Sequence, residues 1–233
     1  MMLANIALMV GAYLFGSLPF AAALARRSGV DLSGETDMHI ALWHKVSKVQ
    51  ASLASFVDIT KGSIPMLVGF GFDLPIAVVT FSGVAAVVGQ MWPPSPNWPG
   101  EKGNTTGAGV IITLALIYHA YLTLLALIPF AIGAALRYYS LASREERFHE
   151  PTHPLALALP VGMFLGFAVA PIASWCSGQP ASITMGLLVL FIIIVVRRLT
   201  CDLKSDVKKG DNLLRILANR FLFDQAAIDG TSK

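Results

Sequence analysis

Long apolar segments, separated by short polar stretches, dominate the pattern of hydrophobic and polar positions along this chain. Seven of these segments approach the length of about 20 residues that a helix needs to cross a bilayer. They run approximately over Leu3–Leu24, Val49–Phe70, Leu74–Met91, Gly107–His119, Tyr121–Tyr139, Leu155–Ile172 and Ile183–Val196. The fourth and fifth are almost fused. The pattern predicts an all-α integral membrane protein built as a bundle of seven transmembrane helices.

The lysine and arginine positions orient this bundle. Cytoplasmic loops carry an excess of both residues. With seven spans, every lysine and arginine except Lys61 falls on one side of the membrane. The positions that segregate in this way before the tail are Arg26, Arg27, Lys45, Lys48, Lys102, Arg137, Arg144, Arg147, Arg197 and Arg198. We therefore expect the N-terminus outside and the C-terminus in the cytoplasm.

The residues after the last span form a polar tail with one amphipathic stretch. Asp211–Ile228 carries leucine, isoleucine and phenylalanine on one helical face and arginine on the other. Asp211 or Asn212 can cap this helix. It is expected to lie on the cytoplasmic interface or to dock on the bundle. The chain is thus divided into a membrane domain, 1–198, and a cytoplasmic tail, 199–233.

Composition agrees with a membrane protein and narrows the function classes. Hydrophobic residues make up 55% of the 233 residues and charged residues 13%, about half of what a soluble domain carries. A net charge of +3 is too small to indicate a nucleic-acid partner. Cys176 and Cys201 would lie on opposite membrane faces, so no disulfide is expected. The partners suggested by composition are therefore the lipid bilayer and small molecules.

The longest polar interruption, Gly89–Thr106, is rich in proline and glycine. Its prolines exclude a regular helix, because each lacks a backbone N–H. Gly100, Lys102 and Gly103 then offer backbone N–H groups and an ammonium just before an apolar helix begins. Such a turn is suited to holding a phosphate at a helix N-terminus. The same spacing also fits an ordinary connector between two membrane helices.

Two polar features lie inside apolar segments. Asp58 and Lys61 fall within the second segment, and their i, i+3 spacing places them on one helix face. They can form an internal ion pair or contribute to a substrate site, because unpaired charges in hydrocarbon are costly. Gly62 and Pro65 follow and can bend or end that helix. In the first segment, Ser17 and Pro19 predict a kink that packs against neighbouring helices.

Further candidate chemistry lies in the cytoplasmic loops. Asp31–Lys48 contains Asp37, His39 and His44, the one loop cluster with acid–base potential. Its spacing fits no standard metal pattern, so no metal site is expected. Arg137 ends the fifth segment, where it can be a snorkelling anchor or a bidentate phosphate ligand.

Four motifs in order resemble the bacterial acyl-phosphate:glycerol-3-phosphate acyltransferases. GSLPF at Gly16–Phe20 is similar to the first-helix signature of that family, and Asp58–Gly62 matches its Asp-x-x-Lys-Gly element. Gly89–Gly103 matches, without a gap, the long motif that ends Gly-Gly-Lys-Gly. Arg137–Ser143 resembles the motif after the fifth helix. The resemblance extends from about Gly16 to Arg198 and agrees with the seven-span topology.

The chain departs from the family pattern at specific positions. The small residues and asparagines of one family loop should fall near Gly34–Trp43, where this chain reads GETDMHIALW. Gln90 replaces the family's histidine and Glu101 its second glycine. A carboxylate beside Lys102 would repel a phosphate or neutralise the lysine. The family's C-terminal element with asparagine and glutamate is not recognisable in Thr200–Asn212.

The resemblance implies transfer of a fatty acyl group from acyl phosphate to glycerol 3-phosphate, which yields lysophosphatidic acid and phosphate. It places the protein in the inner membrane of a bacterium and requires no cofactor or metal. Phosphate-binding candidates on the matched motifs are Gly100, Lys102, Gly103, Arg137 and Ser140. Supporting roles fall to Ser17, Asp58 and Lys61. His39 or His44 is a candidate to position the acceptor or act as base.

Other functions remain open at this point. Gln90, Glu101 and the changed loop also fit a non-catalytic relative that binds a lipid or a partner enzyme. An acyltransferase with a different phosphorylated acceptor lies between these two readings. A small transporter would need a polar path across the bundle, whereas Asp58 and Lys61 are the charges expected at membrane depth.

Overall fold

A computed structural model describes residues 1–32, 38–98, 100–143, 153–201, 203 and 212–224. Over these residues the chain is helical and contains no β-strand. The helices are α1 (Met2–Gly16), α2 (Phe20–Arg27), α3 (Met38–Lys45), α4 (Lys48–Gly71), α5 (Ile76–Met91), α6 (Asn104–Ile117), the 3₁₀ helix η1 (Tyr121–Ala126), α7 (Leu127–Ala142), α8 (Pro154–Cys176), α9 (Ala181–Thr200) and α11 (Leu213–Phe223).

Within the part of the chain that the structure describes, five helical segments are long and apolar enough to cross a membrane. They are Met2–Arg27, Lys48–Gly71, Tyr121–Ser140, Leu157–Cys176 and Ala181–Thr200. Two further apolar helices, α5 and α6, have 16 and 14 residues. At 1.5 Å per residue they measure about 24 and 21 Å, less than the roughly 30 Å of a hydrocarbon core. The prediction of an all-helical, multi-pass membrane protein is confirmed, and the seven-span count stays a prediction.

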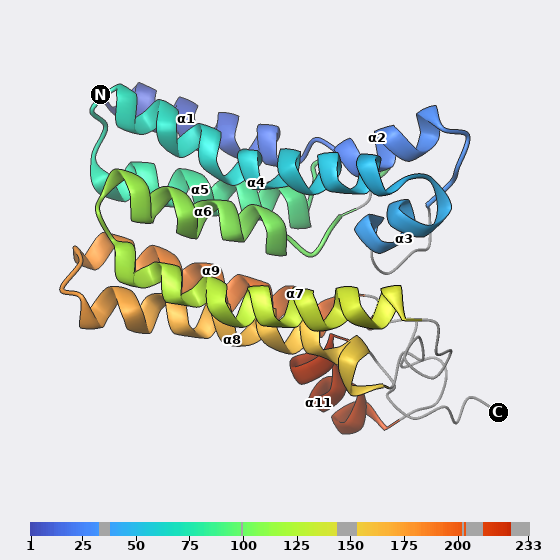
Figure 1. The fold of residues 1–233 in the computed structure, drawn as a ribbon. Helices are drawn as coiled ribbons and strands as arrows, with labels where there is room; N and C mark the ends of the chain where they lie inside the picture. The colour runs from blue at the N-terminus through green and yellow to red at the C-terminus, as the bar shows by residue number, and fades with distance from the viewer. Residues whose placement is uncertain (33–37, 99, 144–152, 202, 204–211, 225–233) are drawn as a thin grey trace.

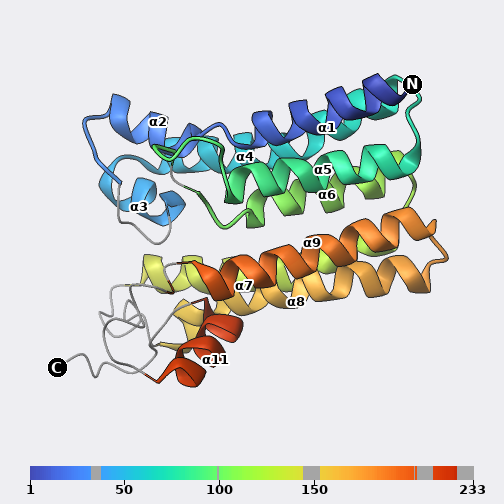
Figure 2. The same cartoon turned by 180° about the vertical axis from the view of Figure 1, so that it is seen from behind.

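The helices form two layers that share one core (Figures 1 and 2). One layer contains α1 to α6, and the other contains α7, α8 and α9, with α11 at one end. Buried apolar side chains of α4, α5, α6, η1, α8 and α9 interdigitate between the layers. Residues of this core include Met66, Val87, Ile111, Phe167, Leu187 and Ile194. A smaller core of alanines, Leu32, Met38 and Leu42 fixes α2 and α3 against α4.

Proline acts differently in the first and second apolar segments. The first segment breaks between α1 and α2, where Pro19 is the N-cap of α2 and Ser17 Oγ donates to the carbonyl of Leu14 at 2.7 Å. The kink predicted there is present. In contrast, α4 continues through Pro65 to Gly71, so the helix does not end near Gly62 as one expectation allowed.

Close contact between α4 and α6 fixes the position of Asp58. A side chain at Gly62 would collide with the carbonyl oxygen of Thr106, and one at Gly109 with that of Ile59. Small residues of this kind let two membrane helices approach backbone to backbone. At this crossing, Thr106 Oγ1 donates to the carbonyl of Asp58 at 2.8 Å.

The described part of the tail packs on the bundle. Asn212 Oδ1 accepts from the Leu214 amide and caps α11, as predicted for this residue; Asp211 lies outside the described residues. The ring of Phe221 packs 4.8 Å from that of Phe164 in α8. Arg220 donates to the carbonyls of Arg198 and Cys201 at the end of α9. α11 therefore lies at the same end of the molecule as α3 (Figure 1).

Candidate active site

A buried group of charges joins α4 to α3. Lys61 Nζ lies 2.7 Å from Asp58 Oδ1 and donates to the carbonyl of Leu18 at 2.7 Å. The other carboxylate oxygen, Asp58 Oδ2, lies 3.0 Å from His39 Nε2. The side chains of Asp58 and Lys61 are almost fully buried. The ion pair expected from the i, i+3 spacing is therefore present, and a histidine from α3 extends it.

The loop before α6 adds a second carboxylate to this group. Glu101 Oε2 lies 3.6 Å from His39 Nε2 and accepts from Gln90 Nε2 at 3.1 Å. The Glu101 amide also donates to the carbonyl of Gln90 at 2.9 Å. Two residues that depart from the family motif thus contact each other, and the Glu101 carboxylate is turned toward His39. We call His39, Asp58, Lys61 and Glu101 the ion-pair cluster.

The protonation of His39 follows from these neighbours. Burial lowers the pKa of His39, but its contacts with Asp58 and Glu101 and the charges of both carboxylates outweigh burial and raise the pKa from 6.5 to about 10. Burial raises the pKa of Glu101, and the contact with His39 opposes that rise. At neutral pH His39 is therefore an imidazolium cation rather than a proton acceptor.

Ser55 completes the surroundings of the His39 ring. Its Oγ lies 3.2 Å from His39 Nδ1 and donates its proton to the carbonyl of Ala51 at 3.0 Å. The hydroxyl oxygen is then left to accept from Nδ1–H. Serine, histidine and aspartate occur together as in hydrolytic triads, but the protons point the other way, because no ring nitrogen is left to take the serine proton. The arrangement holds an imidazolium and does not activate a nucleophile.

The same side chains have the spacing of a metal site. Ligand atoms of His39, Asp58 and Glu101 all lie within 4.8 Å of one another. The sequence did not indicate this grouping, because the three residues are far apart along the chain. The Lys61 ammonium at Asp58 and the proton on His39 already neutralise the two carboxylates, and both cations repel a metal ion. We therefore describe the group as an ion-pair cluster.

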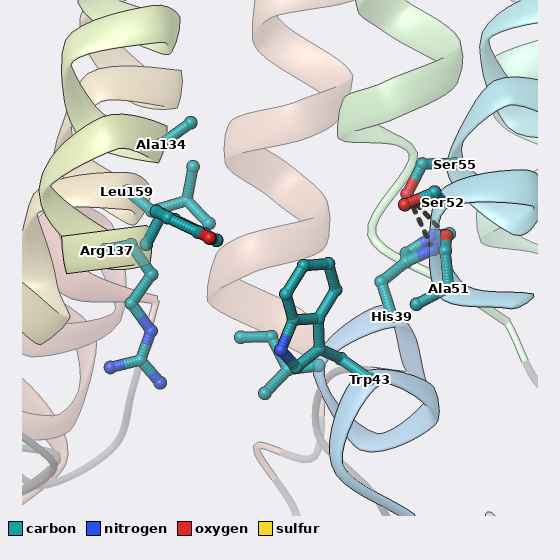
Figure 3. A pocket seen from close by; sticks show the side chains of 10 residues that line it. His39, Trp43, Ala51, Ser52, Ser55, Ala134, Arg137 and Leu159 are labelled. Carbon is teal, nitrogen blue, oxygen red and sulfur yellow. Dashed lines mark hydrogen bonds between the residues drawn. The ribbon is translucent and has the colours of Figure 1, made fainter. Parts of the chain in front are cut away.

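A cavity of about 280 Å³ opens beside His39. Figure 3 shows His39 and Ser55 on one wall, Arg137 and Leu159 on the opposite wall, and Trp43 between them. The Trp43 ring also meets Tyr138 edge-to-face, with 6.2 Å between ring centroids. The lining is mostly apolar, with two cationic side chains placed across it. This combination suits a ligand with a hydrocarbon chain and an anionic group.

The remaining predicted site residues separate into two sets. Ser140 is buried on α7, one turn beyond Arg137. His44 is exposed and is not among the residues that line the cavity. Lys102 Nζ lies 2.6 Å from Asp224 Oδ2, beyond the end of α11. The structure thus brings His39 and Arg137 to one cavity and leads Lys102 toward α11; the roles of all these residues stay predictions.

Arg197 is a functional candidate that sequence reasoning treated only as a membrane-end charge. Its Nη2 donates to the carbonyl of Gly100 at 2.7 Å, and its Nε donates to that of Glu101 at 3.2 Å. Gly103 then adopts a left-handed backbone with φ of 72° and becomes the N-cap of α6. Arg197 therefore holds the loop so that Glu101 and Lys102 point to different neighbours. The sequence signal that could have indicated this role is the presence of two adjacent arginines, Arg197 and Arg198, where one would suffice to anchor the helix end.

Comparison with known proteins agrees with this architecture. The sequence profile of the family described as glycerol-3-phosphate acyltransferase matches residues 6–203. The glycerol-3-phosphate acyltransferase of Aquifex aeolicus is 35% identical over 116 residues, which cover 46% of this chain and 58% of the relative. That of Geotalea daltonii is 33% identical over 149 residues, which cover 61% of this chain and 73% of the relative.

Solved structures show the same fold. Two crystal structures of PlsY (YgiH), described as an integral membrane glycerol 3-phosphate acyltransferase, superpose with TM-scores of 0.61 and 0.64. They are the lysophosphatidic acid form and the glycerol 3-phosphate form, at 23% and 24% identity. The superpositions cover 89% and 93% of this chain and 93% and 94% of the neighbours. With the family profile matched over most of its length, this chain belongs to the glycerol-3-phosphate acyltransferase family.

Proposed function

We propose that the protein is a membrane acyltransferase that moves a fatty acyl group from acyl phosphate to glycerol 3-phosphate. Family membership supports the acceptor, although the match to the Aquifex aeolicus relative spans less than two thirds of that protein. The observation that carries the proposal is the cavity between His39 and Arg137. It has cations on opposite walls and an apolar lining that includes Trp43, Ala134 and Leu159.

The reaction needs positioning more than a reactive side chain. The hydroxyl oxygen of glycerol 3-phosphate attacks the acyl carbonyl carbon, the new ester C–O bond forms, and the bond from that carbon to the phosphate oxygen breaks. Because His39 is an imidazolium at neutral pH, it cannot take the hydroxyl proton. The departing phosphate can accept that proton itself. Arg137 would hold a phosphate. Both ring N–H groups of His39 already face Ser55 and Asp58, so the positive charge of the ring, rather than a hydrogen bond from it, would act on the negative charge that develops during acyl transfer.

The acyl chain can reach this cavity from the lipid. The cavity lies between α3 and α4 on one side and α7 and α8 on the other. Its apolar lining suits the first part of a fatty acyl chain. A membrane protein can thus take a chain sideways from the bilayer while the phosphate stays at the Arg137 end.

We infer a seven-span topology with an external N-terminus for the same chain. α5 and α6 are short, but ten of the 16 residues of α5 are buried by neighbouring helices. A helix in this position does not need to match the full bilayer thickness. α3, the C-terminal end of α7 and α11 lie at the end opposite the N-terminus (Figure 1). Segregation of the basic residues supports placing that end in the cytoplasm, at the inner membrane of a bacterium.

The proposal predicts that Arg137→Ala lowers acyl transfer by about 10- to 100-fold, the effect of losing one charge-assisted contact of about 1.5–3 kcal/mol. The measurement uses purified protein with acyl phosphate and labelled glycerol 3-phosphate, and follows lysophosphatidate. Arg27→Ala, at an exposed arginine on the same side, is the matched control and should stay near wild type. If wild type forms no more lysophosphatidate than Lys102→Ala, the proposal fails.

A different acceptor and a non-catalytic role are separable outcomes of the same assay. The contacts of Glu101 with Gln90 and His39 are the observation that favours testing these two alternatives, because Gln90 and Glu101 depart from the family motif. Turnover with another phosphorylated polyol, but not with glycerol 3-phosphate, would indicate an altered acceptor. Retention of anionic lipid with no turnover on any polyol of the panel would indicate a binding protein.

A further inference from the structure

Arg198 at the cytoplasmic end of α9 is a buried cation with unused donors. Its side chain is 2% exposed, and its Nη2 donates to the carbonyl of Pro160 at 2.9 Å. Its Nε and Nη1 have no hydrogen-bond partner among the described residues. Buried guanidinium donors are normally satisfied, because leaving them unpaired costs free energy. The unused donors of Arg198 indicate a position where an acceptor belongs.

The carboxylate of Asp224 lies near two cations, Lys102 and Arg198. Asp224 directly follows α11, and its Oδ2 lies 2.6 Å from Lys102 Nζ. Its side chain is 6% exposed, and its charge also acts on Arg198. An aspartate carboxylate is a small oxygen anion. It is therefore placed as a bound phosphate would be, with an ammonium on one side and a guanidinium nearby.

The backbone holds Asp224 at this position. Its φ is 59°, a left-handed conformation that aspartate and asparagine tolerate better than most residues. Its amide donates to the carbonyl of Arg220, and Arg220 in turn donates to the carbonyls of Arg198 and Cys201. The contact of Phe221 with Phe164 adds an apolar attachment. The carboxylate is thus presented by a docked helix rather than by a loose tail.

We propose that Lys102 and Arg198 form a phosphate-binding site which Asp224 occupies in the ligand-free protein, so that a phosphate must displace this carboxylate to bind. This rests on the proposed function in that the reaction proposed there binds phosphorylated substrates, for which Lys102 is a phosphate-binding candidate on a matched motif. The ligand class is a phosphate monoester or free phosphate. A phosphate offers more acceptor oxygens than a carboxylate and can use the Arg198 donors that Asp224 leaves unpaired. Asp224 then acts as an internal competitor that weakens phosphate binding.

The test is direct phosphate binding to the full-length protein in detergent, without an acyl donor. Asp224→Asn removes the charge and keeps a side chain that tolerates the left-handed backbone. We expect inorganic phosphate to bind about 2- to 5-fold more tightly than in wild type, the factor that corresponds to losing one competing ion pair worth up to about 1 kcal/mol. Asp73→Asn is the matched control, because Asp73 is exposed, has φ of 51° and lies in a turn at the other end of the molecule. It should leave the dissociation constant unchanged.

Two arms distinguish the source of the phosphate. A gain with glycerol 3-phosphate as well as with inorganic phosphate assigns the site to substrate, and a gain with inorganic phosphate alone assigns it to the released product. Adding Lys102→Ala to Asp224→Asn should abolish the gain in both arms. Unchanged or weaker binding in folded Asp224→Asn would overturn the proposal.

A second measurement uses the wild-type protein and does not depend on a variant folding. A zero-length carbodiimide cross-link should join Lys102 to Asp224, because their charged groups are in contact. Phosphate should lower the yield of that cross-link relative to chloride at equal ionic strength, and an unchanged yield would count against displacement. Both measurements are made without turnover. Tightened binding without lysophosphatidate formation would therefore refute the proposed function alone, and turnover without tightening would refute this inference alone.

Discussion

Glu101 and Lys102 are neighbours in the chain but belong to two different electrostatic environments. Glu101 enters a closed group in which His39 and Lys61 face Asp58 and Glu101, so that two cations meet two carboxylates. Lys102 points to the end of α11, where it meets Asp224, and the charge of Asp224 also acts on the buried Arg198. Arg197 donates to the backbone carbonyls of Gly100 and Glu101, and so fixes the loop just before Lys102.

The difference indicates which of the two regions is built to exchange a ligand. In the ion-pair cluster each charge has an opposite charge beside it, on the same helix for Lys61 and Asp58 and on a neighbouring helix or loop for His39 and Glu101. Binding a further ion would disrupt this balanced set. Near Lys102, one carboxylate lies among cations, and Arg198 has donors left over among the described residues. We therefore interpret the cluster as the support of the cavity wall and the Lys102 region as a place for an exchangeable anion.

The largest expected effect comes from opening the closed cluster. Asp58→Ala leaves Lys61 and His39 without their shared carboxylate, and Lys61 is 1% exposed. Removing one partner of a buried ion pair typically destabilises a protein by about 3–5 kcal/mol. Thermal unfolding in detergent should show a clear loss of stability. Asp73→Asn, at an exposed aspartate whose left-handed backbone (φ 51°) asparagine tolerates, should change stability by less than about 0.5 kcal/mol.

If Asp58→Ala lowers the stability only slightly, the ion-pair cluster does not differ from the Lys102 region in the way described. Such a result would mean that water reaches Lys61 and that the cluster is no more closed than the Lys102 region. The double variant Asp58→Ala with Lys61→Met separates these cases. If the uncompensated ammonium causes the loss, replacing it by an apolar side chain should restore part of the stability.

Much of the fold could be predicted from the sequence, because membrane helices follow from local composition. The apolar segments, the kink at Pro19 and the Asn212 cap depend on residues close together in the chain. The ion pair of Asp58 and Lys61 follows from helical spacing alone. The burial of α5 and α6 by other helices, in contrast, depends on tertiary packing, which a hydropathy pattern does not contain.

The site was only partly predictable, because its contacts join distant parts of the chain. His39 was a candidate from its type, but its carboxylate partners come from α4 and from the loop before α6. A glutamate beside Lys102 suggested a neutralised lysine, whereas the Glu101 carboxylate is turned toward His39 and Gln90. The ion pair of Lys102 with Asp224 depends on where α11 docks. An amphipathic pattern alone fits a membrane surface as well as a helix bundle.

The pH dependence of stability sharpens the description of the closed cluster. The pKa of His39 is raised from 6.5 to about 10 in the folded protein, so its contribution to stability is fully present below pH 6.5 and is lost as pH rises through about 10. Glu101→Gln removes one of the two carboxylates and should move this loss to lower pH. The measurement is the melting temperature from pH 6 to pH 10.5, with His39 titrated by NMR.

His44→Gln provides the control for this titration. His44 is exposed on α3 and lies outside the cluster, so its replacement should leave the pH profile unchanged. If Glu101→Gln leaves the His39 titration where it was, the 3.6 Å contact between His39 and Glu101 does not contribute. The cluster would then end at Asp58.

The smallest expected effect tests how firmly α11 presents Asp224. Asn212→Ala removes the side-chain acceptor of the Leu214 amide and should weaken the start of α11 by about 1 kcal/mol, a typical cost of losing an N-cap. Because Asn212 is exposed and far along the helix from Asp224, the charges near Lys102 stay unchanged.

A less firmly docked α11 makes Asp224 a weaker competitor for phosphate. Phosphate should therefore bind up to about 5-fold more tightly, since the free energy of that factor stays within the lost cap energy. Titration with inorganic phosphate, next to an Asn97→Ala control at an exposed asparagine in the loop after α5, measures this shift. The same substitution is then made in Asp224→Asn. If Asn212→Ala still tightens phosphate binding in that background, α11 obstructs the site as a whole. The comparison would then be between a closed cluster and a site covered by a helix, rather than a site filled by the Asp224 carboxylate.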